Sequence, residues 1–200
     1  MKPKDILIEQ MNKTITPFLT AHKFTFSESK LEYKRKIDNI IQSISFSLNK
    51  WNNEDNCDFW TMWGVTSKEY EKWFQLQWNS KPTNNSLGGK SDWNIMGWTK
   101  DHFQLTNNAN DSVEVNELLM NIEMAGFPFL EKISTWTGAA EEMLKDGLFY
   151  CKPSDFYILE GKYEDSLKTL KAGLEKFKNN GSNDQFNELP GIIDRLNKFH

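Results

Sequence analysis

The sequence of 200 residues is poor in the features that mark several classes of protein. Its two cysteines, Cys57 and Cys151, lack CxxC spacing, and its three histidines lie far from one another and from the cysteines. We therefore expect free thiols in a reducing compartment, with no metal or other cofactor. No apolar run approaches the roughly 20 residues of a membrane span, and the charged N-terminal segment is unlike a signal peptide. These absences predict a cytoplasmic protein without a membrane partner.

Charge of one sign is not concentrated in the chain either. There are 24 Lys and Arg against 28 Asp and Glu, which gives a formal net charge of -4. No basic run is long enough to follow a phosphate backbone, so we expect no nucleic-acid partner. The oligomeric state is left open by the sequence.

Aromatic residues, in contrast, are abundant. They make up 14% of the chain, with eight Trp and fourteen Phe. Rings must therefore supply much of the core volume, and rings left at the surface are typical anchors of protein interfaces.

Residues 39–65 predict the hairpin around which the chain is organised. In the first run Ile44, Phe46 and Leu48 share one parity, whereas Ser43, Ser45 and Ser47 share the other. This period of two is typical of a strand with one buried face. The polar residues 52–56 predict the turn, and residues 57–65 predict a second strand that is apolar on both faces.

The remaining elements are predicted from periodicity and punctuation. The first half contains a helix over 4–20, two short strands over 23–36, a helix over 67–78, a structureless loop over 79–92 and a strand over 93–105. The second half contains a helix that begins with a capping box at 111–114 and ends at Gly126 and Pro128, then short helices over 129–136 and 138–146, the latter stopped by Gly147. A helical hairpin over 153–159 and 163–178, ended by Asn180–Gly181, and a last helix from Pro190 complete it.

These elements predict an α+β fold. An antiparallel meander sheet of about four to five strands packs with an N-terminal helix and is followed by a helical C-terminal half. We expect an α+β domain over residues 1–150 and a docked helical subdomain over 151–200.

Several of these segments also resemble a known family. The resemblance rests on the opening helix, Leu48-Asn49-Lys50-Trp51, Gly64-Val65, Trp98 and Gly126-Phe127-Pro128-Phe129-Leu130. Over residues 4–135 the chain resembles the DUF4304 family. The resemblance implies an α+β fold and no established activity, and it transfers no catalytic residue.

Candidate catalytic motifs do not assemble from the sequence. Gly88-Gly89-Lys90-Ser91 mimics the end of a phosphate loop, but its first glycine is replaced by Asn84 and no helix is predicted after it. Asp101 and His102 are adjacent on a predicted strand, so they point to opposite faces. Cys57 lacks the positive surroundings that activate a thiol. We predict no catalytic residue.

The serines of the first predicted strand supply the functional hypothesis. Ser43, Ser45 and Ser47 share a face with Trp60, which suits either a groove for a ligand or a surface on which helices dock. Our leading hypothesis is a non-enzymatic protein-binding module, of the kind that neutralises a toxin. Its binding residues are Ser43, Ser45, Ser47, Trp51, Trp60 and Trp98. The alternative is a small-molecule or glycan binder or hydrolase that uses Trp51, Trp60 or Trp98 with a carboxylate from Glu54 or Asp58.

Overall fold

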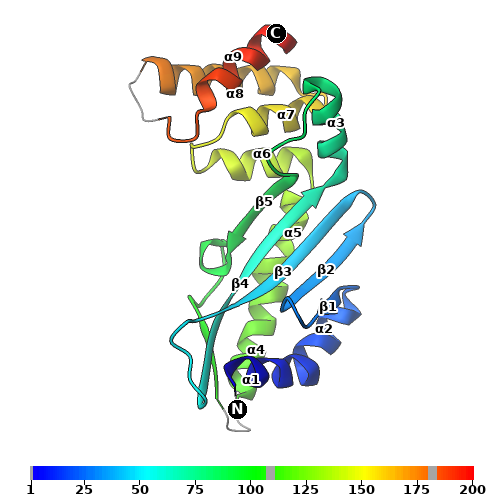
Figure 1. Ribbon diagram of the computed structural model, residues 1–200, viewed down its shortest axis with the longest axis vertical. Coiled ribbons are helices and arrows are strands. Elements are labelled where there is room, and N and C mark those ends of the chain that lie inside the picture. Colours follow the sequence, from blue (N-terminus) through cyan, green and yellow to red (C-terminus); the bar gives the residue numbers. More distant parts are fainter. Residues whose placement is uncertain (1, 107–110, 180–183) are drawn as a thin grey trace. The chain divides into compact units, whose positions relative to one another are not determined.

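The computed structural model describes residues 2–106, 111–179 and 184–200. By their contacts they divide into two compact units, Met1–Glu131 and Lys132–His200. We call these the sheet unit and the helical unit, and Figure 1 labels their elements. The predicted α+β class, with an antiparallel sheet, an N-terminal helix and a helical C-terminal half, is confirmed.

The described residues of the sheet unit form an antiparallel sheet of six strands. Five follow one another as neighbours in the order β1 (Thr25–Ser27), β2 (Glu32–Ile37), β3 (Ile40–Leu48), β4 (Asn56–Ser67) and β5 (Ser86–Ser91). The sixth strand, β6 (Phe103–Thr106), pairs with the beginning of β4, while β5 pairs with its later part. The predicted hairpin of β3 and β4 is therefore the centre of the sheet.

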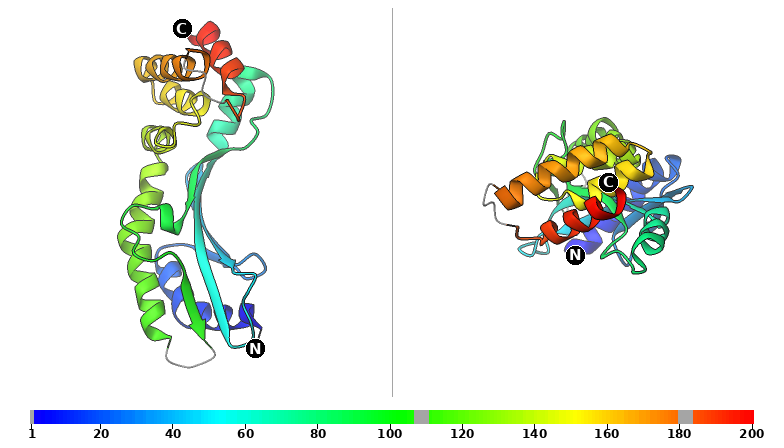
Figure 2. Two further views of the ribbon diagram at one scale, coloured as in Figure 1. Left: turned by 90° about the vertical axis from the view of Figure 1, so that its left-hand side faces the viewer. Right: turned by 90° about the horizontal axis from the view of Figure 1, so that it is seen from above.

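Helices of the sheet unit cover one face of this sheet. α1 (Pro3–Gln10), η1 (Met11–Ile15) and α2 (Thr16–Ala21) form one nearly continuous helical segment, as predicted for residues 4–20. Figure 2 shows this segment and α4 (Ser112–Asn121) on the same side of the strands. α3 (Lys68–Trp78) follows β4 directly, and the Ser67 hydroxyl caps it by accepting from the backbone N–H groups of Glu69 and Tyr70.

Aromatic rings link the strands on the covered face. Each ring contacts the next with centroids 4.5–6.2 Å apart, which lies within the range of favourable aromatic pairs. The series runs through Phe26, Tyr33, Phe46, Phe59, Phe103, Trp98 and Trp63. The expectation that rings supply much of the core volume is confirmed in this unit.

The predicted helix end at Gly126 and Pro128 is wrong. Helical structure continues from α4 through the π-helical turn η3 (Ile122–Gly126) into α5 (Phe127–Ile133). Gly126 serves packing instead of termination, because a Cβ there would lie 2.3 Å from the Trp63 ring. Pro128 is the second residue of α5, directly after the π turn, where the missing N–H is tolerated. Helix 129–136 is accordingly shifted to 127–133.

The predicted capping box at Asp111 is also wrong. No side-chain hydrogen bond caps the start of α4. The Asp111 carboxylate instead accepts hydrogen bonds from the backbone N–H and the hydroxyl of Thr106, at 2.7 and 3.0 Å. It therefore ties the start of α4 to the end of β6.

The structureless loop predicted over 79–92 contains a strand. β5 pairs with β4 through its glycines, with Gly89 opposite Gly64 and Gly88 opposite Val65. A Cβ on Gly89 would lie 2.7 Å from the Trp63 carbonyl oxygen, so glycine is what permits this close pairing. Gly88-Gly89-Lys90-Ser91 thus belongs to a sheet edge rather than to a phosphate loop.

The strand predicted over 93–105 is correct only in its last part. Residues Asp92–Asn94 form the short 3-10 helix η2, a turn follows, and β6 begins at Phe103. Gly97 has a φ of 90°, a conformation that interrupts a strand. At this bend Ile95 is buried, whereas Trp93 and Met96 are exposed.

The helical unit contains the predicted short helix, helical hairpin and final helix. These are α6 (Trp136–Leu144), α7 (Cys151–Leu159), α8 (Tyr163–Leu174) with η4 (Glu175–Asn179), and α9 (Glu188–Phe199). Gly147, with a φ of 62°, ends the helical region after α6 as predicted. The predicted stop at Asn180–Gly181 lies outside the described residues. Division by contacts places α6 with α7, α8 and α9.

Candidate functional site

The three serines of β3 lie on the face of the sheet opposite the aromatic series. Ser43 is opposite Gly64, Ser45 opposite Met62, and Ser47 opposite Trp60. We call these six residues the serine face. All are partly or well exposed, and Met62 retains 39% of its accessible surface. The predicted parity of β3 and β4 is confirmed by this register.

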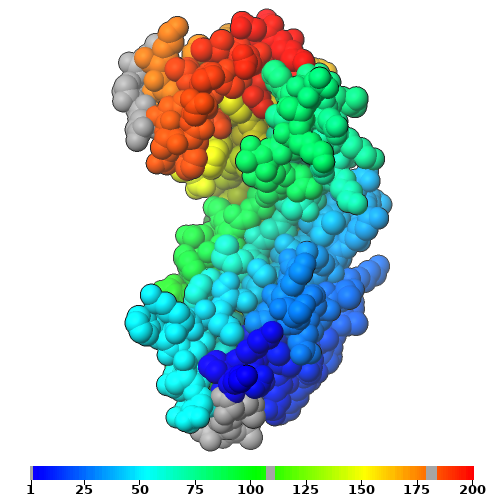
Figure 3. All heavy atoms as spheres, viewed as in Figure 1, coloured from blue at the N-terminus to red at the C-terminus, as the bar shows by residue number. Residues whose placement is uncertain are grey.

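In the middle of the serine face the side chains are small and project little above the strand backbone. Ser43, Gly64 and Gly89 are neighbours across three strands, and Ser45, Met62 and Ser91 form the next row. The serine face thus has little side-chain cover over its backbone. In the space-filling view β2, β3 and β4 reach the surface in the middle of the sheet (Figure 3). A partner could approach the strands closely here.

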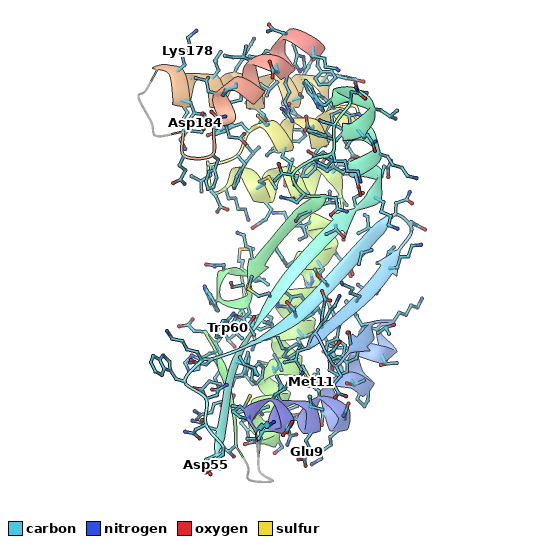
Figure 4. The ribbon with its side chains drawn as sticks, in the orientation of Figure 1. Glu9, Met11, Asp55, Trp60, Lys178 and Asp184 are labelled. Carbon is cyan, nitrogen blue, oxygen red and sulfur yellow. The ribbon has the colours of Figure 1, made fainter. Side chains whose placement is uncertain are left out.

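Two tryptophans form one end of the serine face. Trp60 lies on β4, toward the turn that carries Asp55 (Figure 4). Its ring contacts that of Trp93, with centroids 6.0 Å apart and planes tilted by 60°. Trp93 is 45% exposed. Sequence reasoning missed Trp93, because it lies in the 3-10 helix η2, where strand parity does not assign a side chain to a face.

Trp51 and Trp98 differ in their surroundings. Trp51, in the turn after β3, is 78% exposed, with the Lys50 ammonium 4.9 Å from its ring centroid. Trp98 packs edge-on against Trp63 and Phe103, which belong to the covered face. The structure thus brings Ser43, Ser45, Ser47 and Trp60 together, places Trp51 at the adjoining turn, and separates Trp98 from them.

The two candidate carboxylates lie near the same turn. Asp58 shares the parity of Trp60, and its carboxylate accepts a hydrogen bond from the Gln104 amide at 2.7 Å. The Asp58 backbone N–H and carbonyl oxygen are both bonded to the side chain of Asn52. Glu54 is exposed in the turn. Asp58 therefore joins strands β4 and β6, and its bonds to Asn52 secure the turn.

A buried polar network fixes β4 from its covered side. Asp92 is fully buried, and its carboxylate accepts from the backbone N–H and the hydroxyl of Thr61 at 2.6 and 2.9 Å. The Thr61 hydroxyl in turn accepts from the Trp63 indole N–H at 2.7 Å. Burial raises the pKa of Asp92, although these hydrogen bonds oppose the shift. Sequence periodicity gave no sign of this network.

Neither cysteine is arranged as a nucleophile. Both are free and buried. Burial raises the pKa of Cys57 to about 12, and Asp58 adds to this shift. Burial likewise raises the pKa of the Cys151 thiol. A buried thiol with a raised pKa is a poor nucleophile at neutral pH.

The sheet unit defines an α+β domain with one face covered by helices and a polar, tryptophan-flanked face on the other side. Residues 10–132 match the family model described as "Domain of unknown function (DUF4304)". The chain belongs to the DUF4304 family. Neither a curated protein nor a solved structure matches it.

Membrane-spanning helices and metal-binding clusters are both absent from residues 2–106, 111–179 and 184–200. No helix in these ranges is both long and apolar enough to span a membrane. The same ranges contain no cluster of three His, Cys, Asp or Glu side chains that could hold a metal ion.

Proposed function

We propose that this chain is a non-enzymatic protein-binding module and that its partner docks on the serine face. The observation that carries the proposal is the register of β3 and β4, which aligns three serines and Gly64 beside the partly exposed Met62 and Trp60. A solvent-facing sheet ordinarily carries longer polar side chains. The small side chains leave room for a partner beside Trp60, and tryptophan is enriched among the residues that contribute most to the binding energy of interfaces.

The expected partner is a protein with a flat, mainly neutral surface. Serine and glycine supply no net charge at the centre of the face, while Trp60, Trp93 and Met62 supply apolar area. A toxin that this chain neutralises in the cytoplasm is a partner of this kind. The alternative of a glycan or small-molecule ligand would use Trp51 and Trp60 as stacking platforms with Asp58.

A cross-linking experiment can identify the partner. Both native cysteines are buried, so Ser45→Cys introduces an accessible thiol to which a photo-activated cross-linker can be attached. We expect one protein to be captured by this variant and not by Lys171→Cys, a matched exposed position on α8. Equal capture by both positions would contradict the proposal. Capture of no protein, together with binding of an oligosaccharide probe that Trp60→Ala abolishes, would favour the alternative.

The role of Trp60 can then be measured. Trp60→Ala should weaken binding of the captured partner by 2 kcal/mol or more, roughly the size of an interface hot spot. Because the ring is only partly buried, the free energy of unfolding should fall by less than the roughly 3–5 kcal/mol that a core aromatic costs. Leu76→Ala, which truncates an 83% exposed side chain on α3, is the control. A large loss of stability with unchanged affinity would mean that Trp60 is a core residue.

A further inference from the structure

The outer side of α4 and η3 carries an exposed apolar stripe. Val113, Met120 and Met124 are 75%, 51% and 72% exposed. Their separations of seven and four residues correspond to two turns and one turn of helix, so the three side chains lie along one face. Glu117 occupies the intervening position on that face. We call Val113, Met120 and Met124 the methionine stripe.

The opposite side of the same helical segment packs into the core. Buried positions recur at helical spacing, namely Val115, Leu118, Ile122 and Ala125. The segment is thus apolar on two sides, although a helix at the surface of a domain normally has a polar outer side. Single exposed apolar residues are ordinary, but an aligned set is a feature of docking surfaces.

Methionine is the residue that suits such a surface. Its unbranched, polarisable side chain adapts to differently shaped partners. A third exposed methionine, Met96, lies on the segment next to this helix and is 90% exposed. That segment is held to the helix by the backbone N–H and hydroxyl of Thr99, both of which donate to the Asn121 side chain at 2.9 and 3.1 Å.

The charge around the stripe selects the kind of partner. From Asp111 to Glu131 the sequence has five acidic residues and no Lys or Arg. Asp111 is buried and bonded to Thr106, and Glu131 interacts with Arg35, so Glu114, Glu117 and Glu123 are the acids nearest the stripe. Lys100 pairs with Glu114 at 2.6 Å and with Glu117 at 3.4 Å, which compensates part of this charge. Glu123 is exposed beside Met124. The methionine stripe is therefore mainly apolar, with Glu117 between Val113 and Met120 and with Glu114 and Glu123 at its flanks.

We propose that the methionine stripe docks a basic amphipathic helix of a protein partner. Apolar side chains at helical spacing on that helix would cover the three residues of the stripe, and its Lys or Arg residues would meet the flanking carboxylates. A second copy of this chain fits less well, because symmetric pairing would bring the same carboxylates face to face. This surface lies on the helical side of the sheet, so the proposal does not depend on the serine face.

Methionine methyl NMR on the full chain provides the test. The probe is a synthetic 18-residue peptide of Leu and Lys, with Leu at positions i, i+3, i+4 and i+7. We expect the methyl signals of Met120 and Met124 to shift on titration, while those of Met62 on the serine face and of buried Met11 stay in place. Affinity should fall with added salt, because part of the attraction is between exposed charges.

Variants test whether the peptide binds the methionine stripe itself or any acidic surface of the protein. Met120→Gln combined with Met124→Gln should weaken peptide binding roughly tenfold or more, which corresponds to removal of central interface contacts. The thermal midpoint should be unchanged, because both side chains are exposed. Leu76→Gln, which changes an 83% exposed apolar side chain on α3, is the control and should leave the affinity unchanged.

Four results would overturn the proposal. The first is equal binding of a peptide of the same composition whose order breaks the amphipathic pattern, and the second is equal binding of a Leu and Glu peptide. The third is unchanged affinity of the double variant. The fourth is a shift of the Met120 and Met124 signals with protein concentration alone, which would identify a second copy as the occupant.

Discussion

The sheet unit and the helical unit differ in the residues that fill their interiors. The sheet unit is held by rings and aliphatic side chains that fill one face of a six-stranded sheet. In the helical unit one apolar cluster has the buried members Tyr150, Cys151, Leu170 and Ile192, against which Leu144, Leu174, Phe177 and Leu196 pack, and Phe156 is also fully buried. Its helices approach closely at glycines, because a Cβ on Gly173 would lie 2.6 Å from the Tyr150 ring. Among the described residues of the helical unit, the polar side chains of Ser154, Asp155, Ser166, Thr169 and Arg195 are also buried.

The aromatic core of the sheet unit lies on one face of the sheet. It stabilises this unit without needing the other face, which can therefore carry small polar residues. The helical unit also contains buried polar contacts, such as the hydrogen bond between the Ser154 and Ser166 hydroxyls at 2.8 Å. Substitutions inside the two units should consequently act through different forces.

The largest expected effect is the loss of the buried ion pair in the helical unit. Arg195 donates from Nε and Nη2 to the two oxygens of Asp155, both at 2.7 Å, and Asp155 is fully buried. Arg195→Met would leave the carboxylate without this partner, at a cost of about 3–5 kcal/mol in the free energy of unfolding. Denaturant unfolding followed by circular dichroism measures it.

A double variant shows whether the cost comes from the unpaired charge. Arg195→Met with Asp155→Leu replaces both partners by apolar groups, and it should be clearly more stable than Arg195→Met alone. If both variants were equally unstable, packing rather than charge would hold α7 and α9 together. The proposed contrast between the two units would then fail.

The next largest effect concerns the buried network of the sheet unit. Thr61→Val keeps the shape of the side chain but leaves the Trp63 indole N–H without its acceptor and removes one donor from Asp92. We expect a loss of about 1–3 kcal/mol in the free energy of unfolding. Tryptophan fluorescence reports mainly on this unit, because seven of the eight tryptophans belong to it.

The matched control for this substitution is Thr61→Ser. It keeps the hydroxyl and removes only a methyl group, so it should cost about 1 kcal/mol, less than Thr61→Val. A larger loss for Thr61→Ser than for Thr61→Val would show that the methyl contact, and not the hydrogen bond, stabilises β4.

Local sequence patterns predicted the central hairpin of the sheet unit but not the elements that pair with it. The parity of Ile44, Phe46 and Leu48 against the serines is a local pattern, and it correctly predicted both the hairpin and the composition of the serine face. β5 was missed because Gly88 and Gly89 have no strand propensity of their own and pair only because β4 presents Gly64 and Val65. Trp93 and Trp98 could not be assigned to faces, since the 3-10 helix η2 and the bend at Gly97 interrupt the period of two.

Helix boundaries failed for a related reason. Gly126 and Pro128 are a typical helix stop, but the Trp63 ring requires a glycine at that place and η3 accommodates the proline that follows. The Asp111 carboxylate was expected to cap α4 and instead binds Thr106. In the first case a contact distant in sequence, and in the second a competing hydrogen bond with a residue five positions earlier, decided between two locally acceptable arrangements.

The smallest expected effect uses the cysteines as separate reporters of the two units. Cys57 lies in the sheet unit and Cys151 in the helical unit, and both are buried free thiols. Neither should react with an alkylating reagent in the native state. In a denaturant series with short alkylation pulses, mass spectrometry after digestion should give an unfolding curve for each site. We expect Arg195→Met to shift the curve of Cys151 more than that of Cys57.

Cys57 also adds a pH dependence whose sign follows from its environment. The pKa of Cys57 is raised to about 12 in the folded chain, against roughly 8.5 in an unfolded chain. Between these values the folded state binds more protons, so its stability falls as pH rises from about 8.5 toward 12. Cys57→Ala removes this term. At pH 7 the wild type should be about 1 kcal/mol more stable than Cys57→Ala. By pH 10 this difference should fall by about 1–2 kcal/mol, so that it vanishes or changes sign.

A stability difference that is constant with pH would mean that the Cys57 thiol is not buried in solution. That result would contradict the tightly packed covered face, on which the comparison of the two units rests.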